Sequence, residues 1–164
     1  MRRRGYDRAV PALGTPTLER PPFKFSSFAR VGFSDTDAQG IVYYGRYLPY
    51  FDQARVEYHR HLGLLHADLG GAEFVMRALA VVYEAPAGFD DLLEVYVRTK
   101  RIGRTSVTNE LCAYRAEDGV LMCTSEQTLV LVDLDERRPV PIPDTYREVV
   151  AAFEGADVEL AVAR

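Results

Sequence analysis

The chain contains one long segment in which apolar residues recur every three or four positions, from Gly45 to Leu62. This spacing predicts an amphipathic helix. Pro49 falls near the first turn, where a missing N–H is tolerated, and Gly63 follows as a typical helix-ending residue. The helix has a broad apolar face, so it needs a further layer of structure to cover it.

The other patterned segments predict strands, because they are rich in β-branched and aromatic residues and are bounded by turn residues. They are residues 25–33, 74–84, 92–102, 105–115 and 120–133. Residues 117–119 (Glu-Asp-Gly) form a hairpin turn between the last two. Short connections between successive strands predict an antiparallel sheet. Residues 143–153 predict a short helix that begins at a proline.

This order of elements predicts an α+β domain in which one antiparallel sheet of about five strands wraps around one long central helix. That arrangement is the hot-dog fold. We expect the domain to span residues 25–154, between a flexible, basic and proline-rich tail at 1–24 and a C-terminal tail at 155–164. Exposed sheet edges favour pairing between copies of the chain, which predicts a homo-oligomer.

Composition and charge narrow the class of protein. The 164 residues fit one domain, and 48% hydrophobic with 27% charged residues is typical of globular proteins. No apolar stretch follows the arginines at positions 2–4, so we expect neither a secretory signal nor membrane association, and we interpret the protein as cytoplasmic. Residues 1–24 carry a net charge of +4 and the whole chain −4, so the remainder carries −8. An acidic body argues against nucleic acid as a partner.

The cysteines and histidines do not predict a metal site. Cys112 and Cys123 belong to no CxxC pair, and His59 and His61 are two positions apart, so they do not share a helix face. We therefore expect no bound metal or cofactor.

The loop before the predicted helix holds two carboxylates, Asp35 and Asp37. Asp35 is typical of a residue that caps or shapes a loop. The helix begins a few residues later, just after Tyr43 and Tyr44, and the free N–H groups at a helix N-terminus favour negative charge. A carbonyl group held between these amides and a carboxylate would meet a reacting group on one side and an oxyanion site on the other.

The same segment resembles the signature of the hydroxybenzoyl-CoA thioesterase family. The matching residues are Asp35-Thr36-Asp37, Gly40, Val42-Tyr43, Tyr47, Phe51 and Ala54-Arg55. Similarity continues through residues 83–87, 90–95 and 102–106, so the resemblance covers about residues 26–153. It implies a hot-dog acyl-CoA thioesterase that releases a free acid and CoA, with coenzyme A entering as part of the substrate.

The resemblance also implies roles for individual residues. Asp37 would be the catalytic carboxylate, acting as a nucleophile through an anhydride or as a general base on water. The backbone N–H of Tyr44 would polarise the thioester oxygen. Tyr43, Gly45 and Tyr47 are candidate substrate contacts, with packing in the core as the alternative for Tyr43 and Tyr47. Many family members have histidine where this chain has Tyr44, and the aromatic residue favours an aryl acyl group, with short-chain groups left open.

A basic cluster is the candidate site for the phosphates of coenzyme A. Its members are Arg98, Lys100, Arg101 and Arg104, followed by Thr105 and Ser106. The last four of these six are the candidate phosphate contacts. Because the family binds acyl-CoA at a subunit interface, the cluster would serve the Asp37 of a neighbouring subunit. A solvated strand edge protected by cations explains the same residues equally well.

Other functions stay open at this point. The substrate could be carried by an acyl carrier protein instead of CoA, or the protein could be a non-catalytic acyl-binding or scaffolding member of the fold. A hydratase pairs its carboxylate with a histidine, and no histidine follows Asp37 at short spacing. The assembly is expected to be a dimer or a tetramer.

Overall fold

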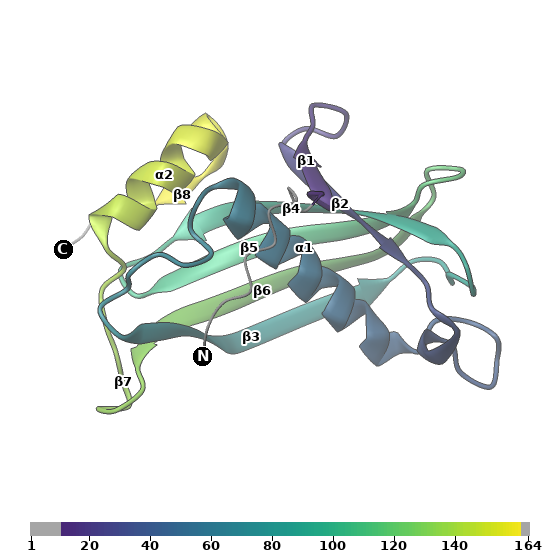
Figure 1. Ribbon diagram of the computed structural model, residues 1–164, viewed down its shortest axis with the longest axis horizontal. Helices are drawn as coiled ribbons and strands as arrows, with labels where there is room; N and C mark the ends of the chain where they lie inside the picture. Colours follow the sequence, from purple (N-terminus) through teal and green to yellow (C-terminus); the bar gives the residue numbers. More distant parts are fainter. Residues whose placement is uncertain (1–10, 162–164) are drawn as a thin grey trace.

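The computed structural model describes residues 11–161 and shows a long helix lying across an antiparallel sheet (Figure 1). The helix is α1 (Tyr47–His61). The five long strands are β2 (Phe25–Arg30), β3 (Ala72–Tyr83), β4 (Leu92–Ile102), β5 (Ser106–Arg115) and β6 (Leu121–Asp133). Three short strands complete the sheet: β1 (Gly14–Pro16), β7 (Arg138–Pro139) and β8 (Glu159–Leu160).

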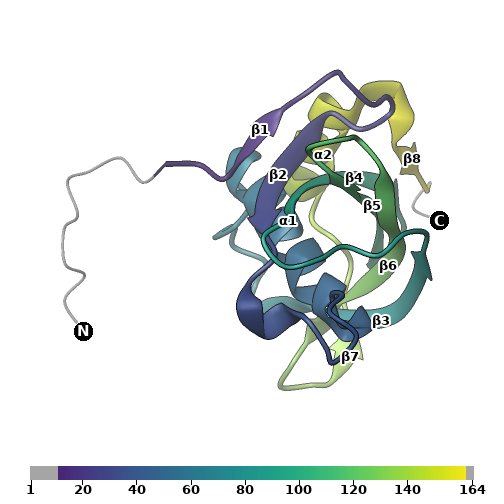
Figure 2. The same ribbon diagram turned by 90° about the vertical axis from the view of Figure 1, so that its right-hand side faces the viewer.

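The sheet has the strand order β1-β2-β4-β5-β6-β3, with β7 beside β6 and β8 beside β4. It curls around α1, as Figure 2 shows along the length of the molecule. A second helix, α2 (Asp144–Glu154), lies at the end of the sheet where β4 finishes and β5 begins (Figure 1). Neither α1 nor α2, the two α-helices of the described residues, has the length and apolar character needed to cross a membrane.

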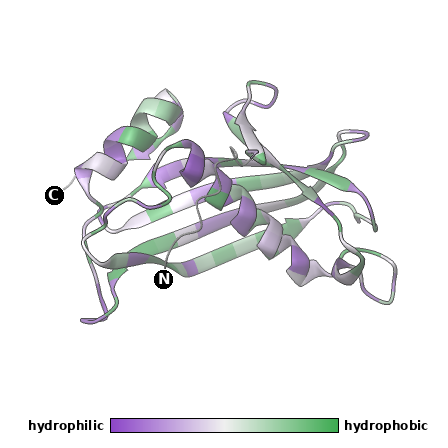
Figure 3. Ribbon diagram, in the orientation of Figure 1, coloured by the Kyte–Doolittle hydropathy of each residue, from purple (hydrophilic) through white to green (hydrophobic). Residues whose placement is uncertain are grey.

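The core lies between α1 and the sheet. Hydrophobic and hydrophilic residues alternate along α1 in Figure 3, and the apolar positions Phe51, Ala54 and Tyr58 are fully buried. They pack in the same cluster as Leu93 and Val95 of β4, which are also fully buried. Burial of an amphipathic helix face on the apolar face of a sheet is what holds this fold together.

The sequence predicted the long elements within a few residues. The sheet, however, has eight strands where about five were expected, and α1 begins at Tyr47, after a 3₁₀ turn, η2 (Tyr44–Arg46). Strand β1 lies within the expected tail 1–24, of which residues 1–10 fall outside the described residues. It forms by backbone pairing with β2. A three-residue strand held by backbone hydrogen bonds leaves no periodic pattern in the sequence.

The expected C-terminal tail also contains structure. A 3₁₀ turn, η3 (Gly155–Asp157), and strand β8 fall within residues 155–164, of which 162–164 lie outside the described residues. Lys24 forms an ion pair with Asp157, 2.6 Å away, and also donates to the carbonyl oxygen of Glu154. These contacts join the segment before β2 to the segment after α2.

Strand β3 forms one edge of the sheet. Its only sheet neighbour among the described strands is β6, and a bulge between Met76 and Ala78 interrupts that ladder. Five large apolar side chains of β3 are 40–54% exposed: Val75, Met76, Leu79, Val82 and Tyr83. A long apolar edge of this kind is a ready template for pairing with another strand.

Candidate active site

Asp37 lies in a tight turn between β2 and the start of the helix. Its backbone N–H donates to the carbonyl oxygen of Ile41 (2.9 Å), and its carbonyl oxygen accepts from the N–H of Gly40 (3.0 Å). Gly40 has φ +78°, a conformation that favours glycine. The Oδ1 atom of Asp37 accepts a hydrogen bond from the N–H of Gln39 (2.8 Å). Within residues 11–161, Oδ2 accepts no hydrogen bond, so this oxygen is available to a substrate.

Asp35 has a different role, because both oxygens of its carboxylate contact groups of the loop and the helix start. Its Oδ2 accepts hydrogen bonds from the hydroxyl of Tyr50 (2.6 Å) and the N–H of Gly32 (2.8 Å). Arg46 lies 3.7 Å from Oδ1. Burial alone would raise the pKa of Asp35, but these hydrogen bonds and the arginine charge lower it below its usual value. Asp35 therefore shapes the loop, as the sequence predicted.

The helix start offers backbone donors close to Asp37. The turn η2 leads directly into α1. The first hydrogen bond of this turn is donated by the N–H of Arg46 to the carbonyl oxygen of Tyr43 (2.8 Å). Among the described residues, the N–H groups of Tyr44 and Gly45 have no hydrogen-bond acceptor. Unpartnered amides at the start of a helix attract negative charge. The predicted oxyanion donor, Tyr44 N–H, is thus free to bind a ligand.

Asp37 and Tyr44 line the same cavity, which has a volume of about 300 Å³. The other residues that line it are Gln39, Ile41, Val42, Tyr47, Tyr83, Glu84, Ala85 and Pro86. They come from the loop, the helix start and the end of β3. The structure therefore brings together the two predicted catalytic groups.

Three tyrosines, Tyr44, Tyr47 and Tyr83, line this cavity, and the ring of Tyr43 packs against that of Tyr44. The ring centroids of Tyr43 and Tyr44 are 4.3 Å apart, those of Tyr44 and Tyr83 are 6.5 Å apart, and those of Tyr47 and Tyr83 are 5.7 Å apart. Tyr47 is only 2% exposed, and burial raises the pKa of its hydroxyl to about 12, so it stays neutral. A Cβ atom at Gly45 would lie 3.0 Å from the ring of Tyr43, so glycine leaves room for this stacking.

Tyr83 is the residue that the sequence reasoning missed. Its hydroxyl donates a hydrogen bond to the carbonyl oxygen of Tyr44 (2.9 Å). In the sequence, Tyr83 lies near the end of a predicted strand, 39 positions after Tyr44. Its only link to the site was that it belongs to a segment that resembles the thioesterase family. Contact between two such distant positions depends on the strand order, which periodicity does not specify.

The basic cluster lies far from Asp37 within one chain. Strand β4 begins beside the Asp37 loop, where Val31 N–H donates to the carbonyl oxygen of Asp91 (2.9 Å), and it runs for 11 residues. At about 3.3 Å per residue, its far end is roughly 30 Å away. Arg101, Arg104, Thr105 and Ser106 lie at that far end, in and around the β4–β5 hairpin.

Three of the four clustered cations are paired with carboxylates. Arg98 is buried and contacts Glu110 (2.7 Å), Lys100 contacts Glu126 (2.7 Å), and Arg101 contacts Glu159 (3.2 Å). Arg104 is exposed and has no such partner within residues 11–161. These pairs reduce the positive charge that the sequence suggested for the cluster.

Within residues 11–161, Arg55 pairs with an amide side chain and with an exposed carboxylate. Its guanidinium donates to the side-chain oxygen of Gln127 on β6 (2.6 Å) and to the mostly exposed Asp52 (2.8 Å). Within residues 11–161, no group of three or more histidine, cysteine, aspartate or glutamate side chains is placed to hold a metal ion.

One long helix wrapped by an antiparallel sheet is the hot-dog fold, and a carboxylate that shares a cavity with Tyr44 at the helix start is an arrangement suited to acyl-group chemistry. A family model described as the thioesterase-like superfamily matches residues 31–153. The chain belongs to this superfamily, which confirms the resemblance seen in its sequence.

Individual relatives support the same assignment. The chain is 35% identical over 132 residues to a Haemophilus influenzae protein named acyl-CoA thioesterase YbgC, and the match covers 79% of this chain and 93% of that protein. A solved structure of a probable thioesterase from Bartonella henselae is similar, with TM-score 0.65, 30% identity and coverage of 72% and 98% of the two chains. The structure of a gentisyl-coenzyme A thioesterase gives TM-score 0.67, 25% identity and coverage of 76% and 98%.

Proposed function

We propose that this protein hydrolyses acyl-CoA thioesters to a free acid and coenzyme A. The observation that carries the proposal is the cavity that Asp37 shares with the unpartnered N–H of Tyr44. Relatives that match most of the chain are named acyl-CoA thioesterases, which supports the same reaction. The reaction needs no bound cofactor or metal, since coenzyme A arrives as part of the substrate.

The two groups supply complementary chemistry. The thioester oxygen would accept a hydrogen bond from the N–H of Tyr44, and this bond strengthens as negative charge develops on that oxygen. The free Oδ2 of Asp37 would attack the carbonyl carbon or remove a proton from an attacking water. In the first route the thiolate of CoA leaves and water then hydrolyses the anhydride. In the second route the hydroxide formed from water displaces the thiolate directly.

The acyl group would be small or aromatic. The cavity around Asp37 is about 300 Å³, and three tyrosines line it, Tyr44, Tyr47 and Tyr83, with the ring of Tyr43 packed against Tyr44. Aromatic side chains bind flat apolar groups by offset and edge-to-face contacts. We therefore place Tyr43, Gly45 and Tyr47, together with Tyr83, beside the bound acyl thioester.

We propose that the functional unit of the protein is a dimer in which the β3 strands of two copies pair. Pairing of two β3 strands would satisfy the unpaired backbone groups of this edge and cover its exposed apolar side chains. Two identical strands related by a two-fold axis run antiparallel. The Tyr83 end of one strand would therefore lie beside the Ala72 end of the other.

This pairing would bring the basic hairpin toward a second active site. The β4–β5 hairpin lies at the same end of the sheet as the start of β3, so in the dimer it lies on the side of the other copy's Asp37. We propose that Arg104, with Arg101, Thr105 and Ser106, contacts the phosphates of coenzyme A there. Arg104 is the strongest candidate because no carboxylate neutralises it within the described residues.

Release of free thiol from a panel of aryl, short-chain and long-chain acyl-CoAs tests the reaction. Wild type should turn over at least one member, and Asp37→Asn should lose at least about a hundredfold in kcat. Asp118→Asn is the control and should match wild type, because it changes an exposed carboxylate of the β5–β6 turn that does not line the Asp37 cavity. Equal rates for wild type and Asp37→Asn would contradict the proposed role of Asp37. The absence of turnover with every thioester would contradict the reaction itself.

A further inference from the structure

The Asp37 cavity holds a second carboxylate, that of Glu84. This residue follows β3 directly and is one of those that line the cavity of about 300 Å³. Among the described residues that line it, Asp37 and Glu84 are the only acidic ones. A reaction that uses one carboxylate as a nucleophile needs another group to activate water afterwards, and a pair of carboxylates can divide these two tasks.

The main chain on either side of Glu84 is fixed by hydrogen bonds to other segments. The N–H of Glu84 donates to the carbonyl oxygen of Met122 on β6 (2.9 Å). Three residues further on, the carbonyl oxygen of Ala87 accepts a hydrogen bond from the N–H of Val42, in the segment that follows Asp37 (2.8 Å). These contacts tie the two carboxylate-bearing segments together, so both carboxylates stay beside the same cavity.

The carboxylate of Glu84 is free to accept a proton. Within residues 11–161, it accepts no hydrogen bond and forms no ion pair, and the residue is exposed, so water reaches it. Its charge also acts on the interior: burial, and then the charge of Glu84, raise the pKa of the Cys123 thiol to about 12. Cys123 is fully buried in the core beside α1. The carboxylate therefore lies close to the face of the sheet that carries the cavity.

Two tyrosines that line the cavity are unsuited to take a proton. Burial raises the pKa of Tyr47 to about 12, and burial also raises the pKa of Tyr83 above its usual value. The hydroxyl of Tyr83 is already used to donate to the carbonyl oxygen of Tyr44 (2.9 Å). Both hydroxyls keep their protons at neutral pH, so a carboxylate is the better base.

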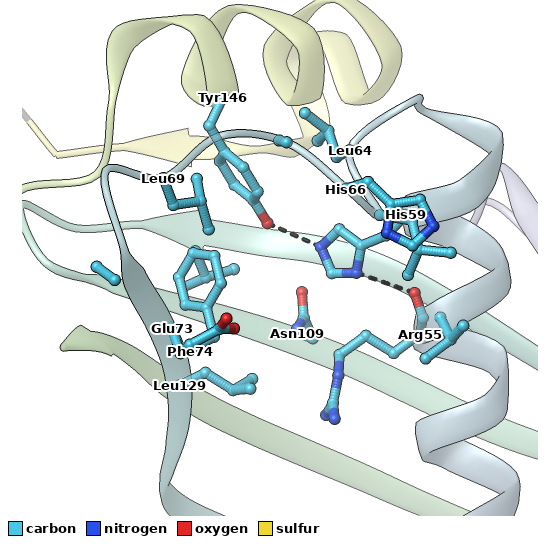
Figure 4. A pocket seen from close by; sticks show the side chains of 15 residues that line it. Arg55, His59, Leu64, His66, Leu69, Glu73, Phe74, Asn109, Leu129 and Tyr146 are labelled. Atoms are coloured by element: carbon cyan, nitrogen blue, oxygen red, sulfur yellow. Dashed lines mark hydrogen bonds between the residues drawn. The ribbon is translucent and has the colours of Figure 1, made fainter. Parts of the chain in front are cut away.

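His59 is also excluded as the base within one copy. It lines a separate cavity of about 520 Å³, between the second half of α1 and the start of β3 (Figure 4). Its Nδ1–H donates to the carbonyl oxygen of Arg55 (3.0 Å), and its Nε2 accepts from the hydroxyl of Tyr146 (2.9 Å), so both ring nitrogens are engaged. The Asp37 cavity borders the other end of β3, roughly 30 Å away.

We propose that Glu84 is a second catalytic residue, the general base that activates water after Asp37 has been acylated. The inference rests on the proposed function and selects its nucleophilic route. The Oδ2 of Asp37 attacks the thioester carbon while the N–H of Tyr44 binds the oxyanion, and the C–S bond then breaks to release the thiolate of CoA. The product is a mixed anhydride, in which the side chain of Asp37 is bonded to the acyl group and cannot serve as the base.

Glu84 acts in the second step. Its carboxylate takes a proton from a water molecule as the water oxygen bonds to the acyl carbon of the anhydride. The bond between this carbon and the Asp37 oxygen breaks, the electron pair returns to Asp37, and the free acid leaves. The proton on Glu84 passes through the solvent to the thiolate of CoA. Water is therefore the only co-reactant, and both carboxylates return to their starting state.

Rapid-mixing kinetics of thiol release test this division of roles. The substrate is whichever of benzoyl-CoA, butyryl-CoA and palmitoyl-CoA wild type hydrolyses fastest. Glu84→Gln should release one thiol per active site at about the rate of the first wild-type turnover, and then turn over about a hundredfold more slowly. Asp37→Asn should show no such burst. Glu148→Gln changes an exposed carboxylate of α2 and is the matched control, which should behave as wild type throughout.

A steady-state rate of Glu84→Gln equal to that of wild type would overturn the inference and leave the proposed reaction intact. Loss of the burst together with the steady state would also overturn it, because Glu84 would then act before acyl transfer. Melting curves of the variant and wild type should coincide, since the side chain has no described contacts to lose. Failure of wild type to hydrolyse all three thioesters is a separate outcome, which contradicts the reaction and the inference with it.

Mass spectrometry of Glu84→Gln, quenched in acid during turnover, identifies the intermediate. The peptide that contains Asp37 should carry the mass of the acyl group, and this adduct should be absent when Asp37→Asn is added. Glu84→Asp should restore part of the turnover and reduce the adduct, because the shorter side chain still offers a carboxylate. A slow Glu84→Gln protein without an adduct on that peptide would show that Asp37 is not acylated, and would overturn the inference.

Discussion

The hydroxyl of Tyr83 donates a hydrogen bond to the carbonyl oxygen of Tyr44 across 2.9 Å, joining the end of β3 to the start of the helical segment. The carbonyl of Tyr44 and the N–H of Gly45 belong to one planar peptide unit. Fixing the oxygen therefore fixes the direction of the Gly45 N–H and also holds the main chain of Tyr44, whose own N–H is the proposed oxyanion donor. Tyr83 would thus be a positioning residue for that donor.

Tyr83→Phe should lower kcat for acyl-CoA hydrolysis by about twofold to tenfold, the equivalent of one net hydrogen bond. KM should change less, because the ring and its packing against Tyr47 remain. Steady-state kinetics on the preferred acyl-CoA measure both values. Tyr114→Phe, on the opposite side of the sheet against Arg20, is the control and should match wild type. An unchanged kcat in Tyr83→Phe would show that the peptide is held without this bond.

Asp35→Ala should destabilise the protein by about 1–3 kcal/mol at pH 7, because Tyr50 and Gly32 lose their acceptor. The folded pKa of Asp35 is lowered, so its contribution is present above its usual pKa and is lost as the pH falls through the folded value. Urea unfolding should therefore separate the variant from wild type at pH 7 and bring the two together in acid. A gap that is constant with pH would mean that the ionised carboxylate is not the stabilising form.

His59 should make stability fall as the solution becomes acidic. Burial, followed by the charge of Arg55, lowers its pKa from 6.5 to about 4. Between these values the unfolded chain takes up a proton that the folded protein does not, so stability is complete above pH 6.5 and decreases toward pH 4. The loss amounts to roughly 3 kcal/mol. Thermal unfolding between pH 7 and pH 4 should show a shallower decline for His59→Gln, and parallel curves would argue against this assignment.

Leu79→Lys should convert the proposed dimer to a monomer. The side chain is 42% exposed near the middle of β3, and two lysines brought together across the edge would repel each other. Light scattering after gel filtration measures the mass, and thiol release measures the activity. Both should fall together, because each proposed site needs two copies. A lysine variant that stays dimeric would place the interface elsewhere.

The sequence predicted the long elements because each one has a clear period. The stripe through Phe51, Ala54 and Tyr58 marks α1, and the alternation of Leu93, Val95 and Val97 marks β4. It did not predict β1, β7 or β8, which are two or three residues long and form through backbone pairing. A β-ladder depends on the neighbouring strand, so such short segments have no signature of their own.

The candidate site was predictable where it lies within one stretch of chain. Asp37 and Tyr44 are seven positions apart and share one cavity, as expected from a carboxylate loop before a helix. Contacts made through the tertiary structure were beyond the sequence. They include Tyr83 at the cavity and the pairing of Arg98, Lys100 and Arg101 with glutamates from other strands. A count of cations along one strand does not reveal which carboxylates face them.

The two edges of the sheet differ in length: β1 at one side has three residues and β3 at the other has twelve. A sheet with two long bare edges could add a neighbour on each side and grow into a fibre. Within residues 11–161, only the β3 side offers enough backbone for a further strand, and a bulge at Arg77 restricts how that strand can align. In the proposed dimer, the second copy would occupy this side and leave no long edge for a third copy. Growth would then end after one step, so a long exposed edge strand need not lead to polymerisation.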